Sequence, residues 1–324
     1  MSTPEGCSKM VEIAEPTREG LAAALNARAL AYESKGELDC ALIEFDRAIQ
    51  LEPEFSALYN NRGNLYLEKG QYDRAIENFS EALQLEPDNA DATNNLGGAY
   101  FHMNDVEAAI KSYDRALNLK PDYAKAYNNR CSAYLSAGDL QRATRDCSEA
   151  IRLKPDYIEA HYNCGIARMR LGELDGAIAE FDYAIRLKPG FADAYNIRGT
   201  VFSSKGARER AIQDFDEAIR LNPDFVGAYY NRALALYAIG ERDRAIADFS
   251  AVTRLKPDFA QAFNNRGSLY AEEGLIDRAI QDFDEAIRLR PDYAKALRNR
   301  EIALKRKSEQ EQASHNTGRL PDRP

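Results

Sequence analysis

Proline recurs along this chain at a fixed interval of 34 residues. The eight members of the series are Pro53, Pro87, Pro121, Pro155, Pro189, Pro223, Pro257 and Pro291. When each copy is numbered with Ala22 as position 1 of the first, position 20 is alanine and position 30 is leucine in all eight copies. A unit of this length buries its apolar face only against its neighbours, so the pattern predicts a tandem array rather than a globule.

Each copy predicts a helix, a tight turn and a second helix. Apolar residues have helical spacing at positions 4, 8 and 11, and again at positions 20, 24, 27 and 30. Position 15 is glycine in seven copies and Asn104 in the other, which suits a left-handed residue at the end of the first helix. Position 24 is aromatic in seven copies and Cys147 in the fourth copy, so this position is predicted to lie in the core.

These residues resemble the tetratricopeptide repeat pattern, which has small residues at positions 8, 20 and 27, aromatic residues at 11 and 24, and proline at 32. The resemblance covers residues 22–293 and departs from the pattern at position 4, which is never tryptophan, and at position 7, which is arginine in six copies. It implies an all-α fold: a right-handed α-α superhelical solenoid of eight helix-turn-helix repeats, with the first helices lining a concave groove. The usual role of such arrays is protein–protein interaction.

The remaining chain divides by composition. Residues 1–17 are expected to be a disordered segment, and the repeat array is expected to occupy residues 18–293. Residues 294–307 continue the first-helix pattern and predict a C-terminal capping helix. Residues 308–324 have the composition of a disordered tail.

Composition narrows the possible functions. A net charge of −9 and a pI near 5.1 argue against nucleic-acid binding. The first 20 residues contain no signal-peptide pattern and no later run could span a membrane, so we expect a cytoplasmic protein without membrane insertion. The five cysteines do not resemble a disulfide framework, and no motif predicts a metal, a cofactor or catalysis. We therefore expect a protein that is not an enzyme.

The arginines at position 7 are predicted to be structural. In five copies an acid follows sixteen residues later, at position 23. The pairs are Arg28 with Glu44, Arg130 with Asp146, Arg198 with Asp214, Arg232 with Asp248, and Arg266 with Asp282. Positions 7 and 23 face each other in an antiparallel helix pair, so these residues predict ion pairs within each repeat.

Asparagine is the residue that needs a functional explanation, because it is a poor choice in a helix interior. The candidate peptide-binding residues are Asn61, Asn95, Asn129, Asn163, Asn231 and Asn265 at position 6, with Asn60, Asn94 and Asn128 at position 5. They resemble the asparagine ladder of peptide-binding arrays such as that of O-GlcNAc transferase, where amides hold the backbone of a ligand.

Two explanations of this ladder remain open. Duplication copies residues whether or not they have a use, and RAIQDFDEAIRL indeed occurs identically at 210–221 and 278–289. Against this, each asparagine costs up to about 0.7 kcal/mol relative to alanine. If the amides serve a ligand, replacing Asn95, Asn129 and Asn163 with alanine is expected to raise the melting temperature and to weaken binding.

The ladder is interrupted by apolar residues in the fifth to seventh copies. Tyr162, Ile197, Tyr230 and Tyr237 are predicted to line the groove there and to seat a hydrophobic anchor. The groove positions of the eight copies have a net charge of −4, counted from six acids and two bases. The expected partner is therefore a protein or peptide segment that is uncharged to mildly basic. The alternative is a scaffold that self-assembles through its convex face or its ends.

Overall fold

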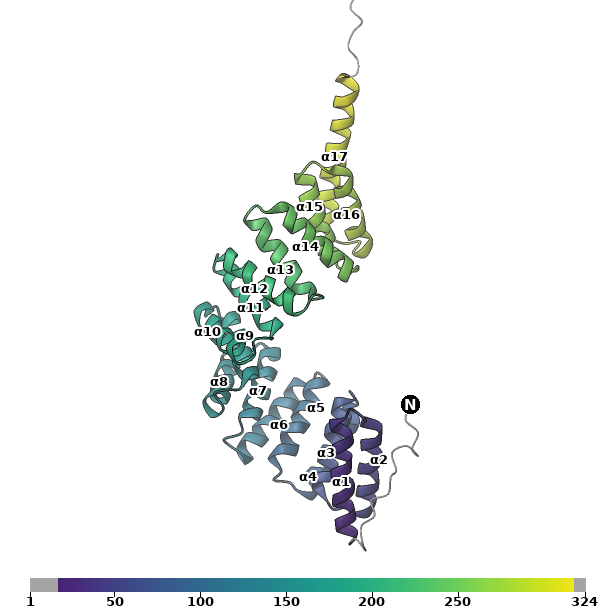
Figure 1. Ribbon diagram of the computed structural model, residues 1–324, viewed down its shortest axis with the longest axis vertical. Helices are drawn as coiled ribbons and strands as arrows, with labels where there is room; N and C mark the ends of the chain where they lie inside the picture. Colours follow the sequence, from purple (N-terminus) through teal and green to yellow (C-terminus); the bar gives the residue numbers. More distant parts are fainter. Residues whose placement is uncertain (1–16, 318–324) are drawn as a thin grey trace, which may run out of the picture. The chain divides into compact units, whose positions relative to one another are not determined.

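The computed structural model describes residues 17–317 of the 324-residue chain, and in this range it contains helices joined by short turns (Figure 1). The helices follow one another in antiparallel pairs, which confirms the all-α solenoid of eight helix-turn-helix repeats. Their bounds are α1 Arg18–Ser34, α2 Leu38–Leu51, α3 Ser56–Glu68, α4 Tyr72–Leu85, α5 Ala90–His102, α6 Val106–Leu119, α7 Ala124–Ala137, α8 Leu140–Leu153, α9 Ile158–Leu171, α10 Leu174–Leu187, α11 Ala192–Ser204, α12 Arg208–Leu221, α13 Val226–Ala238, α14 Arg242–Leu255, α15 Ala260–Glu272, α16 Ile276–Leu289 and α17 Ala294–Thr317. The chain forms two structural units, Met1–Leu171 and Gly172–Pro324.

The turn inside each repeat has the backbone that the sequence predicts. Glycine at position 15 has a φ between 69° and 85° in seven repeats. Asn104 takes the same place in the third repeat with a φ of 63°. Asparagine tolerates this left-handed conformation better than other residues with a β-carbon, so the exception keeps the turn.

In seven of the eight repeats the core is an aromatic ring at position 24 packed against a small residue, and in the fourth repeat the buried Cys147 takes the place of the ring. The rings at position 24 are almost completely buried; Phe79, for example, has no exposed surface. A β-carbon placed on Gly63 would lie 2.6 Å from the Phe79 ring, and one on Gly199 would lie 2.7 Å from the Phe215 ring. Position 8 is therefore small because the backbone of the first helix touches the ring of the second.

All five predicted arginine–carboxylate pairs are present, with shortest N–O distances of 2.5–2.7 Å. For Arg130, Arg198 and Arg232 the structure adds a partner that the sequence did not predict, because the same guanidinium also reaches an acid of the preceding repeat. Arg130 donates from Nε and Nη2 to Asp146 at 2.7 and 2.8 Å, and from Nη1 to Asp114 at 2.6 Å. Arg62, whose position-23 residue is Asn78, bonds to that amide at 2.8 Å and to Asp46 at 2.7 Å. These arginines therefore join repeats as well as helices.

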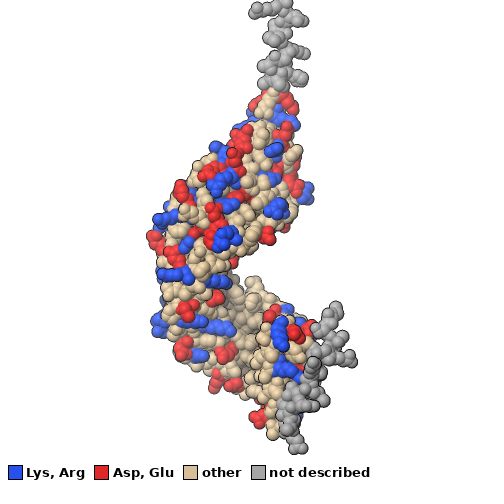
Figure 2. Space-filling view, viewed as in Figure 1, with Lys and Arg blue, Asp and Glu red and all other residues tan. Residues whose placement is uncertain are grey.

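Charges of both signs are interspersed on the surface shown in Figure 2. Several second helices carry the same exposed pair near their C-terminal end. Examples are Glu149 with Arg152, Glu217 with Arg220, and Glu285 with Arg288, at 2.5–2.6 Å. Such pairs satisfy surface charge but contribute little to stability.

The two ends of the array differ from the predicted boundaries. Thr17 caps α1, since its hydroxyl oxygen accepts from the Gly20 amide at 3.1 Å, while residues 1–16 of the predicted disordered segment lie outside the described residues. The capping helix α17 does not end at Lys307 but continues to Thr317. Residues 308–317 therefore correct the prediction of a disordered tail. They contain helix-forming Glu and Gln and no Gly or Pro, so nothing in them stops the helix.

Candidate functional site

The ladder asparagines form hydrogen-bonded rungs between successive repeats. In each rung the position-6 amide donates from Nδ2 to the position-5 side chain of the preceding repeat. In unit 1 the rungs are Asn61 to Asn26, Asn95 to Asn60, Asn129 to Asn94, and Asn163 to Asn128, at 2.9–3.2 Å. In unit 2 they are Asn231 to Asn196, Asn265 to Tyr230 and Asn299 to Asn264, at 3.0–3.1 Å.

The acceptors of several rungs are buried between the repeats. Asn94 is 1% exposed and Asn128 is 6% exposed, whereas their donors Asn129 and Asn163 are half-buried. Replacing Asn129 or Asn163 therefore removes the partner of a buried amide oxygen. The expectation that alanine raises the melting temperature counted helix propensity alone, and these buried partners remove its physical reason.

In the rungs the position-6 asparagines use their Nδ2 groups, and their Oδ1 atoms differ in whether they have a donor. Asn95 and Asn265 also accept through Oδ1 from the asparagine that precedes them, at 3.3 and 3.2 Å. Among the described residues, the Oδ1 atoms of Asn61, Asn129 and Asn163 have no donor. The same is true of Asn231. Half-buried amide oxygens fixed in place by their own N–H groups are suited to accept from the backbone of another chain.

In unit 1 three of the predicted ladder residues line a cavity. A space of about 260 Å³ lies between α3, α5 and α7, and Asn94, Asn95 and Asn129 form part of its wall. Lys125, at position 2 of α7, and Phe101, on α5, line the same cavity. Three amides of the ladder, a cation and an aromatic ring therefore lie together on the wall of one cavity.

In unit 2 one of the residues that interrupt the ladder keeps its hydrogen bond. Tyr230 replaces the position-5 asparagine, and its hydroxyl oxygen accepts from Asn265 in the same way as an amide oxygen. Tyr230 and Tyr237 line a cavity of about 630 Å³ between α13, α15 and α17. Ile197 is half-buried on α11 and lines neither cavity, and Tyr162 lies on α9 in unit 1. The four predicted anchor residues are thus not brought together by one cavity.

The rung was not predicted, although the sequence contains a signal for it. Asparagine at position 6 is preceded, 35 residues earlier, by asparagine at position 5 in five of the six repeats that have it, and by Tyr230 in the other. Asn299 of α17 obeys the same rule with Asn264. This coupling between neighbouring repeats is what a contact between helices requires, whereas a free ligand-binding residue needs no such partner.

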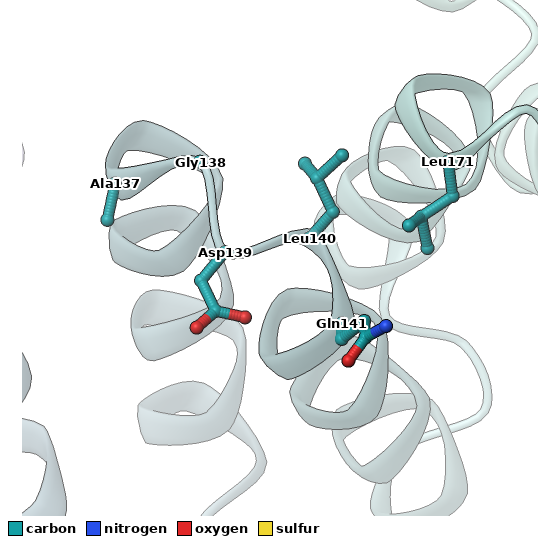
Figure 3. A pocket seen from close by; sticks show the side chains of 6 residues that line it. All are labelled: Ala137, Gly138, Asp139, Leu140, Gln141 and Leu171. Carbon is teal, nitrogen blue, oxygen red and sulfur yellow. The ribbon is translucent and has the colours of Figure 1, made fainter.

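A separate depression of about 490 Å³ lies at the turn between α7 and α8 and reaches Leu171 of α9 (Figure 3). Its one carboxylate belongs to Asp139, which caps α8 by accepting from the backbone N–H of Arg142 at 3.0 Å. The Arg142 guanidinium also bonds to Asp139, and the two contacts lower the pKa of this carboxyl. The charged group here therefore serves the helix end, and none of the predicted site residues lies in this depression.

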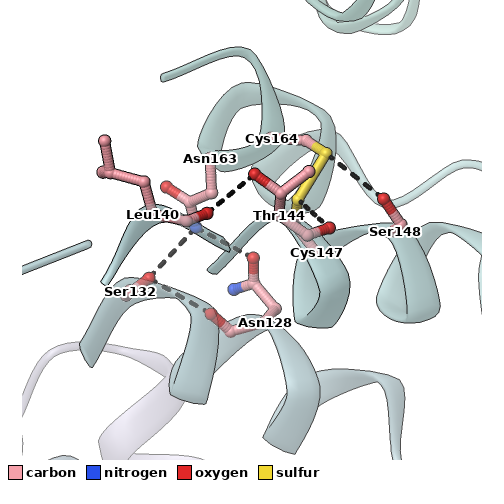
Figure 4. Close-up of a disulfide and its surroundings, with 8 residues drawn as sticks. All are labelled: Asn128, Ser132, Leu140, Thr144, Cys147, Ser148, Asn163 and Cys164. Atoms are coloured by element: carbon pink, nitrogen blue, oxygen red, sulfur yellow. Dashed lines mark hydrogen bonds between the residues drawn. A yellow bond between two sulfur atoms is a disulfide. The ribbon is translucent and has the colours of Figure 1, made fainter. Parts of the chain in front are cut away.

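Cys147 of α8 and Cys164 of α9 form a disulfide beside one rung of the ladder (Figure 4). Asn163, the neighbour of Cys164, donates to Asn128 at 2.9 Å and to Ser132 at 3.1 Å. The spacing of the five cysteines, which does not resemble a disulfide framework, therefore gave no indication of this pair. The two residues occupy positions 24 and 7 of adjacent repeats, so irregular spacing in sequence hid a contact that the solenoid creates.

Within the described residues, no helix has the length and apolar character needed to cross a membrane.

Family models match most of the chain. Models described as tetratricopeptide repeat match residues 22–55, 60–124 and 230–294, and a model described as TPR repeat matches 132–172 and 199–240. No curated protein matches the chain.

Solved structures resemble the chain as well. The APC/C hetero-tetramer Cut9-Hcn1 matches 82% of this chain with a TM-score of 0.62 at 18% identity, and the match spans about half (52%) of that chain. A tetratricopeptide repeat protein from Parabacteroides merdae ATCC 43184 matches 72% of this chain and 93% of its own, with a TM-score of 0.58 at 21% identity. YrrB, described as a TPR protein with an unusual peptide-binding site, matches 59% of this chain and 99% of its own, with a TM-score of 0.50 at 26% identity.

Proposed function

Because the chain belongs to the tetratricopeptide repeat family, we propose that it is a non-catalytic scaffold that holds an extended segment of a partner protein against its ladder face. The ladder face comprises the side chains at positions 5 and 6 of the first helices. The observation that supports this proposal is that, within residues 17–317, no donor reaches the Oδ1 atoms of the half-buried residues Asn61, Asn129, Asn163 and Asn231. YrrB, at 26% identity, has a peptide-binding site by its description, which is consistent with the same use.

The rungs hold these oxygens in a fixed orientation, which favours binding. An amide that donates to the preceding repeat cannot rotate freely, so less conformational entropy is lost when its oxygen accepts from a ligand. An extended peptide presents backbone N–H groups at regular intervals, and the ladder presents acceptors at one position per repeat. The proposed partner is an uncharged to mildly basic segment, because acids outnumber bases at the groove positions of the repeats.

The test distinguishes a role in peptide binding from a role in repeat packing. It removes either the donor or the acceptor of the same rung. Asn129→Ala and Asn94→Ala both lose the hydrogen bond between α7 and α5, but only Asn129→Ala also removes the surface oxygen. Peptides selected from a random displayed library on the wild-type protein serve as probes, with affinity measured by calorimetry. We expect Asn129→Ala to weaken binding about fivefold relative to Asn94→Ala, as the loss of one hydrogen bond predicts. Equal affinities of the two variants, or selected peptides that protect other surfaces, would contradict the proposal.

The alternative, self-assembly through the array ends, has one observation in its favour. Leu297 and Leu304 on the outer side of α17 are 45% and 41% exposed. Between them lies Glu301, at position 8, where the eight repeats have glycine, alanine or cysteine. A carboxylate at the point of closest helix approach opposes the packing of another helix, so we favour the peptide-binding function.

A further inference from the structure

The cavity between α13, α15 and α17 has a rigid apolar wall. Tyr230 packs against Phe249 and Phe259, with ring centroids 5.7 and 5.0 Å apart, and its hydroxyl is fixed by Asn265. Leu234 and Tyr237 complete the wall and remain 41% and 42% exposed. The volume of about 630 Å³ is within the range of small-ligand sites and is ample for one large apolar side chain.

The charge of this cavity differs from that of the repeats. The net charge of −4 at the groove positions counts residues of the eight repeats and omits α17. That helix contributes Lys295 to the wall of this cavity and Arg306 to a neighbouring cavity of about 190 Å³. The two cavities adjoin, since both are lined by Ser268, Glu272 and Asn299. Cations therefore flank the apolar wall along one helix.

The single carboxylate that lines these cavities is already neutralised. Glu272 accepts from the Tyr237 hydroxyl at 2.7 Å and from Arg242 Nε at 3.2 Å. Lys295 and Arg306 have no carboxylate within 4.0 Å among the described residues, and the Arg306 guanidinium donates only to the Ala271 carbonyl at 3.4 Å. Both cations are thus available to a ligand.

We infer that this end of the ladder face binds a peptide segment in which a leucine or aromatic anchor is flanked by aspartate or glutamate. The inference rests on the proposed function and refines it, because the partner then has a charge polarity. Its acidic end lies over α17, and its uncharged to mildly basic part lies over the repeats. The apolar wall takes the anchor, and the carboxylate beside it pairs with Lys295 or Arg306 at the edge of a low-dielectric cavity, where such pairs are stronger than in water. A basic flank would place like charges together.

The experiment uses arrays of capped nonapeptides, so that only side chains contribute charge. Each peptide has a central phenylalanine or leucine, flanked on one side by glutamate, serine or lysine, with the other positions randomised. We expect the full-length protein to retain glutamate-flanked peptides at least tenfold more strongly than lysine-flanked ones. Lys295→Glu combined with Arg306→Glu is expected to reverse this preference, and Leu234→Asp is expected to abolish the requirement for the anchor.

The matched control is Arg288→Glu, which makes the same change of charge on α16, where Arg288 pairs with Glu285 away from the cavities. It should leave the preference intact. Binding without a preference for acidic flanks, or a preference that the double charge reversal does not alter, overturns this inference and leaves the proposed function standing. Failure to retain any of the peptide pools overturns both. Melting curves of each variant confirm that it is folded.

Discussion

Arginine at position 7 shows how one side chain can join two repeats. The guanidinium has five N–H donors in a rigid fork, and Arg130 uses the fork on the buried Asp146 and on Asp114 of the preceding repeat. Burial opposes the charge of Arg130, but the two carboxylates outweigh it and raise the pKa of the guanidinium. Leucine at this position would serve one repeat only.

Replacing Arg130 with methionine is expected to destabilise the protein by about 3 kcal/mol, because Asp146 then stays buried without its partner. Burial is the largest influence on the Asp146 pKa and raises it, and the variant removes the arginine that opposes this rise. A carboxyl whose folded pKa lies above its unfolded value is protonated more readily when folded. The deficit should therefore shrink as the pH falls through the raised pKa.

Chemical denaturation at several pH values measures this deficit. Arg130→Met combined with Asp146→Leu should recover most of the loss, since no buried charge remains. The control is Arg152→Ala, which removes an exposed pair with Glu149 and should leave the denaturation midpoint unchanged. A deficit for Arg130→Met no larger than that of the control would show that the buried pair is not structural.

The ladder asparagines lead to a second prediction at this scale. Replacing Asn95, Asn129 and Asn163 together with alanine should lower the melting temperature, contrary to the expectation from helix propensity. The rungs to the buried Asn94 and Asn128 each leave an amide oxygen without its donor at a cost of about 1–3 kcal/mol, whereas alanine offsets at most about 0.7 kcal/mol at each position. The oxygens affected belong to Asn60, Asn94 and Asn128. Calorimetry decides between the two signs, and a melting temperature above that of the wild type would show that the rungs are dispensable.

At the scale of helices, the disulfide ties α8 to α9 across the boundary between two repeats. Disulfides persist in oxidising compartments and are rare in cytosolic proteins. The disulfide therefore conflicts with the predicted cytoplasmic location, in which the two thiols would be reduced. A third cysteine, Cys131 of α7, lies in the same hydrophobic core cluster as this pair; it is buried and free, and burial raises the pKa of its thiol to about 12. A thiol of this kind is a weak nucleophile and is not expected to exchange with the disulfide.

Peptide mapping of protein trapped with an alkylating agent at cell lysis tests the pairing. Trypsin should release residues 146–152 and 153–168 as one cross-linked species, which separates on reduction. Because the bond closes a short loop, reduction should also lower the free energy of unfolding by about 3 kcal/mol. Recovery of the two peptides separately, each alkylated, would contradict the disulfide and support a reducing location.

Much of the fold was predictable because the eight repeats share one sequence pattern. Glycine or asparagine at position 15 predicts the turn in every copy, and position 8 is a small residue wherever position 24 is aromatic. The eight copies therefore support the same prediction. The rungs, the second arginine partner and the disulfide were not predicted, because each joins residues of different repeats. A pattern written for one repeat does not contain such contacts. The length of α17 was missed for another reason: a polar composition indicates solvent exposure but does not exclude a helix.

For the whole molecule, we expect the exposed side of α17 to determine whether the protein is a monomer or self-associates. Exposed Leu297 and Leu304 favour stacking, but Glu301 stands between them, and a net charge of −9 adds repulsion between copies. We therefore expect light scattering to give the monomer mass of 36.3 kDa. Glu301→Ala should produce a mass that rises with concentration, because the end then has the small residue that close helix packing requires. Glu309→Ala makes the same change further along the same helix and should remain monomeric. A wild-type mass of twice the monomer would favour the self-assembling scaffold over the peptide-binding one.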